Sequence, residues 1–548
     1  MSHSWSRENR RLKRMKELKF EELTTAQKLG MVMAGIIRPL KPTDNYESFD
    51  ENLEYTLELI RNHSLGAVWI PPAIPRRKEA IAKVKEAADY PILIMTDVEN
   101  GLGEYRIGRH NAIGMADKEE LAYTFGKVTA ITARQMGYNV VCAPVLDMQN
   151  KWGATGTNIR SLGCDKYRVT ELAKAEAEGL RDGGVLRIGK HYPGGDNPLR
   201  VDSHMAERYS EMTKEELLDY SLYPYLELMK DDLLDGIMTA HCKFANIDSE
   251  YPASLSKKVI DIIREQGFEG VAITDALDMM GIKAKFGDTR SKGMCVQAGN
   301  EFILPWFSTA KAYRDLTDCY NEGIITDERL DEAVRRILAA QKKVLEMTPK
   351  YTEITDDDAT QFARINSESV HARVDEGLDI AIPCNKKYFF VMLVHNESEI
   401  NDMGKVSVDT FTNGWYFPTR VAAKIEELFP NSYVRPIYQF PTNHQNCNVL
   451  QDSLGYDDVI FITFAEAPAY TGSDNLTHRI VALIKAMQYT GRISTVAHFG
   501  NPFVLEELPH IPRILMGSVG ADNIDAALEV LAGKREAKGV LTYDVNFQ

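Results

Sequence analysis

Short apolar runs rich in Val, Ile and Leu recur along the N-terminal part of the chain. They lack the apolar-polar alternation of a strand with one solvated face, so they predict strands covered on both faces. Helical segments such as 118–137 and 166–184 lie between most of these runs. The runs are 29–35, 65–70, 90–97, 138–148, 184–192, 236–244, 270–276 and 300–306.

Eight strands that alternate with helices predict an α/β fold of the (β/α)8 barrel type, with a doubly wound open sheet as the alternative. A helix at 326–347, with Thr326 as its N-cap, is expected to complete the barrel. The polar segment 348–358 and a helix around 360–380 then lead into a second, smaller α/β layer domain. Its predicted strands are 387–394, 432–440, 458–466, 493–500 and 513–519.

These patterns predict four parts along the chain. Residues 1–25 form a polar N-terminal helix or arm, and residues 26–347 form the barrel. Residues 348–384 are a linker and helix, and residues 385–548 form the second domain. We find no internal repeat and no low-complexity tract in the sequence.

The chain has 548 residues and a formal net charge of −15 at pH 7, which argues against a general nucleic-acid binder. The basic stretch 7–19 also contains Glu8 and Glu17 and is interpreted as a solvated helix. Apolar stretches are too short to cross a membrane, and the polar start has no signal-peptide core. The seven cysteines are scattered without a CxxC pair, as in reduced proteins. We predict a cytoplasmic protein without nucleic-acid or membrane partners, and its oligomeric state stays open.

Polar residues follow the apolar runs at the ends of five predicted strands. In barrels of this type the carboxyl ends of the strands meet at one face, where the active site is built. Five polar strand ends directed at one cavity predict a pocket for a polar substrate. They are Asp97, Asp147, Lys190 with His191, His241 and Asp275.

The segment KHYPGGDNPLRVDSH, residues 190–204, combines two histidines with a Pro-Gly-Gly turn and a terminal Asp-Ser-His. By itself, such a stretch is typical of an exposed polar loop. Its His191, Asp196, Asp202 and His204 lack the tight spacing of a metal motif such as HExxH, so we expect no metal site. The role of this segment can be interpreted only together with the rest of the chain.

The sequence resembles the family 3 glycoside hydrolases, in the branch of the β-N-acetylglucosaminidases. Residues 190–194 are similar to the family's Lys-His-Phe-Pro-Gly loop, and Asp202-Ser203-His204 matches its Asp-Ser-His. The C-terminal region looks like the α/β sandwich domain of two-domain members, so the resemblance covers residues 25–548. Further blocks follow in the family's order at 143–148, 158–163, 238–242, 252–256 and 272–281.

The resemblance implies a retaining mechanism in which Asp275 is the nucleophile and His204, paired with Asp202, is the acid and base. A short carboxylate at the end of a rigid strand suits the first role, although Asp in this position also commonly caps the next helix. An imidazole exchanges protons near neutral pH without needing a buried carboxylic acid, and a neighbouring carboxylate fixes its tautomer. Residues two apart in an extended loop point to the same side, so Asp202 can reach His204. The mechanism implies no cofactor.

The resemblance also implies a set of sugar-binding residues, namely Asp97, Arg160, Lys190 and His191. Arg and Lys only donate hydrogen bonds while Asp accepts them, which suits the alternating hydroxyl groups of a pyranose. From the residues alone, Arg160 and Lys190 are equally suited to buried ion pairs with Asp97 or Asp147, and such pairs do not exclude sugar binding. His241 is either a sugar contact or a support behind the site.

Three blocks depart from the family pattern. The usual Pro-Gly-His-Gly turn is Pro193-Gly194-Gly195 here, and the loop 190–204 is slightly longer. Residues 97–101 read Asp-Val-Glu-Asn-Gly in place of Asp-Glu-Gly-Gly, and residues 274–276 read Thr-Asp-Ala in place of Ser-Asp-Asp. The nucleophile and the Asp-His pair are retained, but the loop geometry and the substrate preference stay open.

Three functions are open from the sequence. The first is a retaining β-N-acetylglucosaminidase that acts on the ends of small carbohydrates such as chitooligosaccharides or muropeptides. The second is a β-N-acetylglucosaminide phosphorylase, because anionic phosphate approaches the glycosyl-enzyme more easily when the acid is not a carboxylate. The third is a β-glucosidase or a catalytically weak sugar-binding protein.

Overall fold

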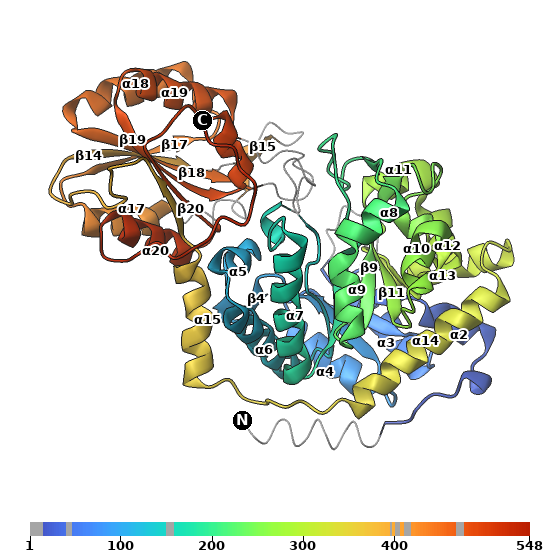
Figure 1. Cartoon of the computed structure of the whole chain (residues 1–548). Helices are drawn as coiled ribbons and strands as arrows, with labels where there is room; N and C mark the ends of the chain where they lie inside the picture. Colours follow the sequence, from blue (N-terminus) through green and yellow to red (C-terminus); the bar gives the residue numbers. More distant parts are fainter. Residues whose placement is uncertain are drawn as a thin grey trace. The chain divides into compact units, whose positions relative to one another are not determined.

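The computed structural model describes residues 15–39, 47–148, 158–394, 397–400, 406–409, 418–466 and 476–548 (Figure 1). These residues belong to two compact units. The first lies within residues 1–106, 122–148 and 165–359, and the second within 107–121, 149–164 and 360–548. The four-part division predicted from the sequence stays a proposal.

An eight-stranded parallel sheet forms the core of the first unit. The strands are β1 (Ala34–Ile36), β2 (Ala67–Trp69), β3 (Leu93–Asp97), β6 (Val140–Cys142), β7 (Leu186–Tyr192), β9 (Gly236–Thr239), β11 (Val271–Ala276) and β12 (Phe302–Leu304). They pair in chain order, and β1 meets β12 through a parallel bridge between Met33 and Ile303. The Ile303 amide also donates to the carbonyl of Val32 at 3.0 Å. The sheet therefore curves into the predicted barrel.

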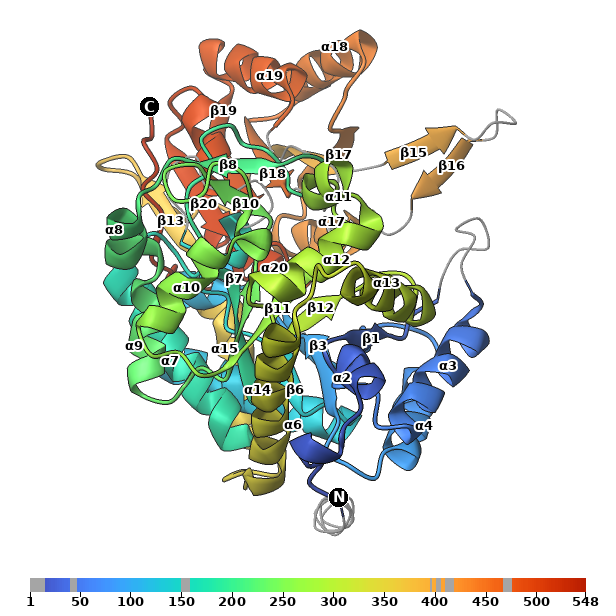
Figure 2. The same ribbon diagram turned by 90° about the vertical axis from the view of Figure 1, so that its right-hand side faces the viewer.

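Helices surround this barrel, as Figure 2 shows. They are α2 (Thr25–Met31), α3 (Phe49–Arg61), α4 (Arg77–Ala87), α6 (Glu119–Met136), α7 (Lys166–Gly183), α8 (Lys214–Glu216), α9 (Tyr223–Lys230), α10 (Lys257–Glu265), α11 (Met280–Phe286), α12 (Asp288–Ala298), α13 (Thr309–Asn321) and α14 (Asp327–Glu346). Side-chain caps explain where several of them begin. Ser48 caps α3, Asp165 caps α7, and Thr326 accepts from the Arg329 amide at the start of α14, as predicted.

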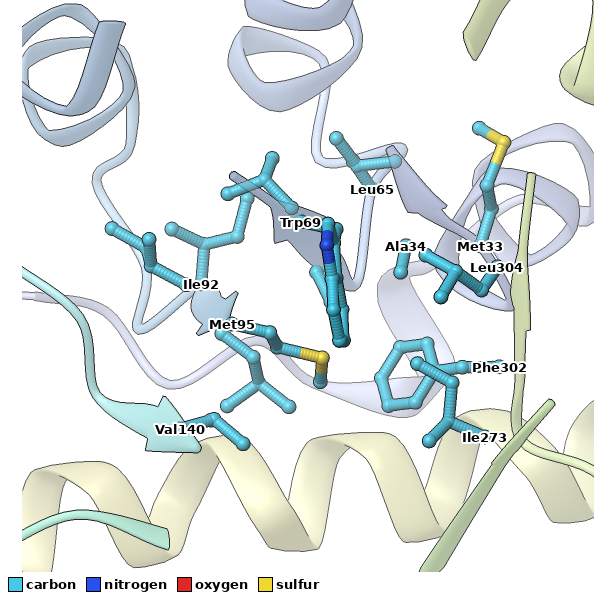
Figure 3. Packing of buried hydrophobic residues seen from close by; sticks show 14 of the residues in the cluster. Met33, Ala34, Leu65, Trp69, Ile92, Met95, Val140, Ile273, Phe302 and Leu304 are labelled. Carbon is cyan, nitrogen blue, oxygen red and sulfur yellow. The ribbon is translucent and has the colours of Figure 1, made fainter. Parts of the chain in front are cut away.

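Large apolar side chains fill the inside of the barrel (Figure 3). Trp69, Met95, Ile273 and Phe302 come from four different strands and are buried together. Because helices cover the outer face of the sheet, both faces are buried, which explains the continuous apolar runs in the sequence. Burial of one such side chain stabilises the fold by roughly 1.5–3 kcal/mol.

Two predicted strands begin or end elsewhere than expected. Residues 29–31 form the end of α2, because the capping box of Thr24 and Gln27 starts a helix just before the apolar run. Strand β6 ends at Cys142, shortly before Pro144. Proline has no amide hydrogen to donate to a neighbouring strand. Beyond it the chain pairs with β7 through an isolated parallel bridge between Val145 and Lys190.

A third predicted strand, 236–244, divides into two. Its first half is β9, whereas β10 (Cys242–Phe244) pairs in parallel with β8 (Arg208–Ser210). This small sheet lies at the end of the loop that follows β7. A second short pair, β4 (Gly101–Leu102) with β5 (Tyr105–Arg106), follows β3 directly.

A six-stranded sheet forms the core of the second unit. In spatial order its strands are β13 (His371–Val374), β20 (Arg513–Gly517), β19 (Ile493–Gly500), β18 (Asp458–Ala465), β14 (Tyr388–Val394) and β17 (Tyr433–Tyr438). The helices around it are α17 (Pro418–Leu428), α18 (Asn443–Asp452), α19 (His478–Tyr489) and α20 (Ala521–Leu531). Figure 1 shows α17 and α20 on one face of the sheet and α18 and α19 on the other, an α/β sandwich.

The remaining elements of the second unit include one correction. The predicted helix around 360–380 is shorter, since α15 (Asp356–Glu368) ends before β13, which joins the sheet antiparallel to β20. A hairpin of β15 (Glu397–Ile400) and β16 (Val406–Asp409) follows β14. The unit also takes in α5 (Asn111–Ala116), which the chain reaches after β5.

His498 is a buried titratable group in the middle of this sandwich, with a side chain that is only 1% exposed. Its Nε2 donates to the carbonyl of Asn501 at 2.8 Å, and its Nδ1 lies 2.8 Å from the hydroxyl of Thr463. Burial lowers the pKa of His498 to about 4, and the hydrogen bond to Asn501 offsets only part of this effect.

We expect the second unit to lose stability as the pH falls from about 6.5 to about 4. In this window the unfolded chain binds a proton at His498 that the folded chain does not, a difference worth roughly 3 kcal/mol. The variant His498→Gln retains hydrogen-bonding groups without titrating. Its free energy of unfolding in urea should therefore depend less on pH between 7 and 4 than that of the wild type. Equal pH dependence in the two proteins would contradict the prediction.

Candidate active site

The neighbouring strands β7, β9 and β11 carry several polar residues at the carboxyl end of the barrel. The register places Tyr192 and Thr274 on either side of Thr239. His191 comes just before Tyr192 in β7 and Asp275 comes just after Thr274 in β11, so both residues lie next to this level of the sheet. Strand β3 joins this group through β6. The barrel thus gathers most of the predicted residues at one edge.

Lys190 is a buried cation with two acidic partners. Its side chain is 2% exposed, and its Nζ lies 2.5 Å from an oxygen of Asp97 and 2.5 Å from an oxygen of Glu99. The ion pair with Asp97, one of the arrangements that the sequence allowed, is therefore present. The Asp97 side chain is still 46% exposed and offers an acceptor to a bound molecule.

His191 is held by Asp147, a residue that follows β6. One carboxylate oxygen of Asp147 lies 2.6 Å from the ring Nδ1 of His191 and 3.1 Å from its amide nitrogen. Both side chains are buried. A carboxylate only accepts hydrogen bonds, so the Nδ1 carries a hydrogen and Nε2 is the nitrogen left for other contacts.

Asp275 lies at the end of β11, with its carboxylate only partly exposed. The Ala276 amide donates to this carboxylate at 2.7 Å. Burial raises the pKa of the Asp275 carboxyl, but His191, His241, the Ala276 amide and His204 together lower it more. The net effect is a pKa below the ordinary value, so Asp275 is ionised at neutral pH.

His241 is hydrogen-bonded to the end of β11. Its Nδ1 lies 2.7 Å from the Ser254 hydroxyl, and its Nε2 lies 3.1 Å from the carbonyl oxygen of Ala276. Burial lowers the pKa of His241, while Asp275 and the Ala276 carbonyl act in the opposite direction. Of the two roles left open by the sequence, these contacts favour the support of the strand end.

Asp202 and His204 form a pair in the loop after β7, as their spacing predicts. One oxygen of Asp202 lies 2.8 Å from the ring Nδ1 of His204 and 2.9 Å from its amide nitrogen. The Asp202 side chain is 7% exposed, whereas that of His204 is 32% exposed. A buried carboxylate thus orients an accessible imidazole whose charge also acts on Asp275.

The altered part of this loop, 193–201, has its own internal support. The buried Asn197 donates to the Val201 carbonyl at 2.8 Å and accepts from the Val201 amide at 3.1 Å. Arg208 of β8 donates to the carbonyls of Gly195 and Asp196 at 2.5 and 3.1 Å. The sequence did not identify Asn197 or Arg208, although a small amide between Asp and Pro is a recognisable turn signal.

Arg160 is the one predicted site residue that belongs to the second unit. It ends the 3-10 helix η3 (Asn158–Arg160), and its carbonyl accepts from the Nδ1 of His110 at 3.0 Å. Its role in sugar binding stays a prediction. Glu99 was not identified from the sequence as a partner of Lys190, since its position was noted only as a departure from the family pattern.

A small pocket lies beside the segment that follows Asp275. Leu277 and Asp278 form one side of it, and the loop after β12 contributes Trp306 and Phe307. The guanidinium of Arg38 stacks on the Trp306 ring at 4.7 Å. Along the described ranges, no three His, Cys, Asp or Glu side chains are grouped to hold a metal ion, and no helix has the length and apolar composition needed to cross a bilayer.

The sequence model described as the glycosyl hydrolase family 3 N terminal domain matches residues 53–340, more than half of the chain. The chain belongs to glycosyl hydrolase family 3. A β-hexosaminidase of Histophilus somni (strain 2336) is 27% identical over 309 residues, covering 52% of this chain and 87% of that protein. The predicted resemblance, its β-N-acetylglucosaminidase branch and the assignment to the glycoside hydrolases are confirmed.

Solved structures of the same architecture include a family 3 β-N-acetylglucosaminidase from Paenibacillus sp. str. FPU-7. It aligns with 96% of this chain and 100% of its own, with a TM-score of 0.77 and 24% identity. A β-glucoside phosphorylase aligns with 96% of this chain and 95% of its own, with a TM-score of 0.75 and 22% identity. At these identities the likeness shows a shared fold, the predicted barrel followed by an α/β sandwich.

Proposed function

We propose that the protein is a retaining, exo-acting β-N-acetylhexosaminidase that releases terminal N-acetylglucosamine from chitooligosaccharides or muropeptides. The observation that carries this proposal is the ionised Asp275 at the end of β11, within electrostatic reach of a histidine that a buried aspartate orients. The β-hexosaminidase of H. somni and the family 3 β-N-acetylglucosaminidase of Paenibacillus support the substrate class.

In the first step, a carboxylate oxygen of Asp275 bonds to the anomeric carbon while the bond from that carbon to the leaving oxygen breaks. His204 donates a proton to the leaving oxygen and becomes neutral. The lowered pKa of Asp275 keeps its carboxylate ionised, and therefore nucleophilic, at neutral pH.

In the second step, His204 takes a proton from water as the water oxygen bonds to the anomeric carbon. The ester bond to Asp275 breaks, and its electron pair returns to the carboxylate. Asp202 accepts from the Nδ1 and the amide of His204 through one oxygen, which fixes the ring and leaves Nε2 as the atom that moves the proton. Two displacements at one carbon give overall retention.

The terminal sugar is proposed to bind Asp97, Lys190, His191 and Arg160. Asp97 accepts from sugar hydroxyl groups, and the ion pair with Lys190 holds its carboxylate in place. We also propose a cytoplasmic location, since each of the seven cysteines is a free thiol. The phosphorylase, β-glucosidase and weak sugar-binding alternatives gain no specific support, because the likeness to a β-glucoside phosphorylase is one of fold.

Asp275→Ala should abolish turnover and leave the fold intact, because the first displacement needs the carboxylate. A slow fluorosugar substrate should label Asp275 covalently in the wild type, as measured by mass spectrometry of peptides. Asp261→Ala, which removes a carboxylate bonded to Lys257 on α10, is the matched control and should keep full activity. Inversion at the anomeric carbon would contradict the assignment. Assays with and without phosphate, in which formation of a sugar 1-phosphate is measured, test whether water or phosphate accepts the glycosyl group.

Asp97→Ala and Arg160→Ala should each weaken catalysis through loss of charge-assisted hydrogen bonds, worth roughly 1.5–3 kcal/mol each. The loss in kcat/KM should shrink on a substrate that lacks the matching hydroxyl group. Glu99→Gln is the control, since Glu99 shares Lys190 with Asp97 but has a side chain that is largely buried. Equal losses on intact and deoxy substrates would show that Asp97 acts only as the partner of Lys190.

His204→Ala should slow the cleavage of disaccharides about 10²–10⁴-fold while sparing the first step on nitrophenyl glycosides, which need no proton. The glycosyl-enzyme should accumulate because the second step lacks its base, and azide should relieve this block since it needs no deprotonation. Asp202→Asn should show a milder form of the same defect. If good and poor leaving groups slow equally and azide restores nothing, His204 is not the acid and base.

A further inference from the structure

The helix α11 begins four residues after the end of β11 and is bonded to the loop that carries the Asp-His pair. The first amides of a helix have no acceptor within the helix. In α11 the Met280 amide donates to the carbonyl of His204, and the Gly281 amide donates to the carbonyl of Ser203, both at 3.0 Å. The segment that continues from the nucleophile strand therefore holds the backbone of the catalytic loop directly.

Gly281 allows this contact because it has no side chain. A Cβ at this position would lie 2.7 Å from the carbonyl oxygen of Ser203 and 2.8 Å from that of Ala206. Both neighbours are backbone atoms, so a side chain here requires one segment to move. Gly281 has ordinary helical geometry, and space rather than conformation is the reason for glycine.

Hydrogen bonds join residues 202–206 of the loop into one turn. The amides of Met205 and Ala206 donate to the Asp202 carbonyl at 2.9 and 3.0 Å, which closes a turn around Ser203 and His204. Glu207 then ties the end of this turn to α11, since its carboxylate lies 3.7 Å from the Nζ of Lys285. A displacement of the backbone at the Gly281 contact is therefore expected to move His204 and Asp202 together.

We propose that Gly281 and the Met280 amide are positioning elements that set the separation between His204 and Asp275. The proposal rests on the function proposed above, because it concerns the proton transfer from His204. Reacting groups must be held within about 0.5 Å of their productive geometry, and a displacement of about 1 Å costs up to 10²-fold in rate. Through the contact with α11, the position of His204 depends on β11, the strand that carries Asp275.

Two variants disturb this contact in different ways. Gly281→Ala pushes the turn away through its Cβ. Met280→Pro removes the hydrogen bond to the His204 carbonyl together with the methionine side chain. Proline is well tolerated at the first position of a helix, and the preceding Met279 has the extended backbone that proline requires. Met280→Ala retains the amide and is the matched control for loss of the half-exposed methionine side chain. Gly35→Ala crowds the side chains of Leu65 and Thr309 at 3.1 and 3.3 Å and controls for a packing defect elsewhere.

The measurement is the dependence of kcat/KM on the leaving group, from nitrophenyl to methyl glycosides and disaccharides, with and without azide. Gly281→Ala and Met280→Pro should slow the poor leaving groups about 10- to 100-fold and the nitrophenyl glycosides much less. They should also change the pH profile for the poor leaving groups, and azide should speed release of the glycosyl-enzyme. Met280→Ala and Gly35→Ala should keep the leaving-group dependence of the wild type.

Two results would overturn the proposal while leaving the proposed function intact. One is a wild-type leaving-group dependence in both Gly281→Ala and Met280→Pro, in a protein where His204→Ala shows the expected defect. The other is an equal slowing of all leaving groups by both variants. If His204→Ala itself shows no leaving-group effect, the assignment of His204 as the acid is wrong. The positioning role proposed for Gly281 and the Met280 amide is then wrong as well.

Discussion

Charged side chains at the carboxyl edge of the barrel lie next to a densely packed apolar interior, and a buried charge there is stable only with a partner. Lys190 forms ion pairs with Asp97 and Glu99, and His191 contacts Asp147. Asp97 and Glu99 lie at the end of β3 and Asp147 follows β6, so the pairs join the end of β7 to the ends of these two strands. The positions of the sugar-binding candidates therefore depend on how these charges are neutralised, as well as on the barrel itself.

The sequence predicted the eight barrel strands because burial on both faces leaves continuous apolar runs, and because these runs alternate with helical segments. It misplaced the beginning at residue 29 because the capping box of Thr24 and Gln27 is a local signal that overrides the apolar pattern. It missed β13, whose half-buried residues at the edge of a sheet show neither alternation nor a continuous apolar run. Local signals such as a capping box therefore set where these elements begin and end, whereas the repeated apolar runs indicated the fold.

The candidate site was predictable where one strand end or one short loop supplies the residues. Asp202 and His204 are two residues apart, and their contact follows from that spacing. Which acid pairs with Lys190 depends on the relation between strands and could not be predicted, and neither could the pairing of Asp147 with His191. The contact of α11 with the loop depends on a backbone approach at Gly281 that no side-chain pattern reveals.

The proposed mechanism requires one histidine to serve two opposite steps, and the charge on Asp275 bears on both. His204 lowers the pKa of Asp275, and by the same interaction the negative carboxylate of Asp275 favours the imidazolium form of His204. Before the proposed first step, the anionic Asp275 therefore attracts the proton that His204 is to donate. Once Asp275 is esterified by the sugar, its charge is gone and the attraction that favoured the imidazolium is lost. Loss of this attraction makes the neutral imidazole, the form that takes a proton from water, easier to reach than before the first step. In the proposed mechanism, formation of the glycosyl-enzyme thus removes one of the charges that hold a proton on His204 and assists its change from acid to base.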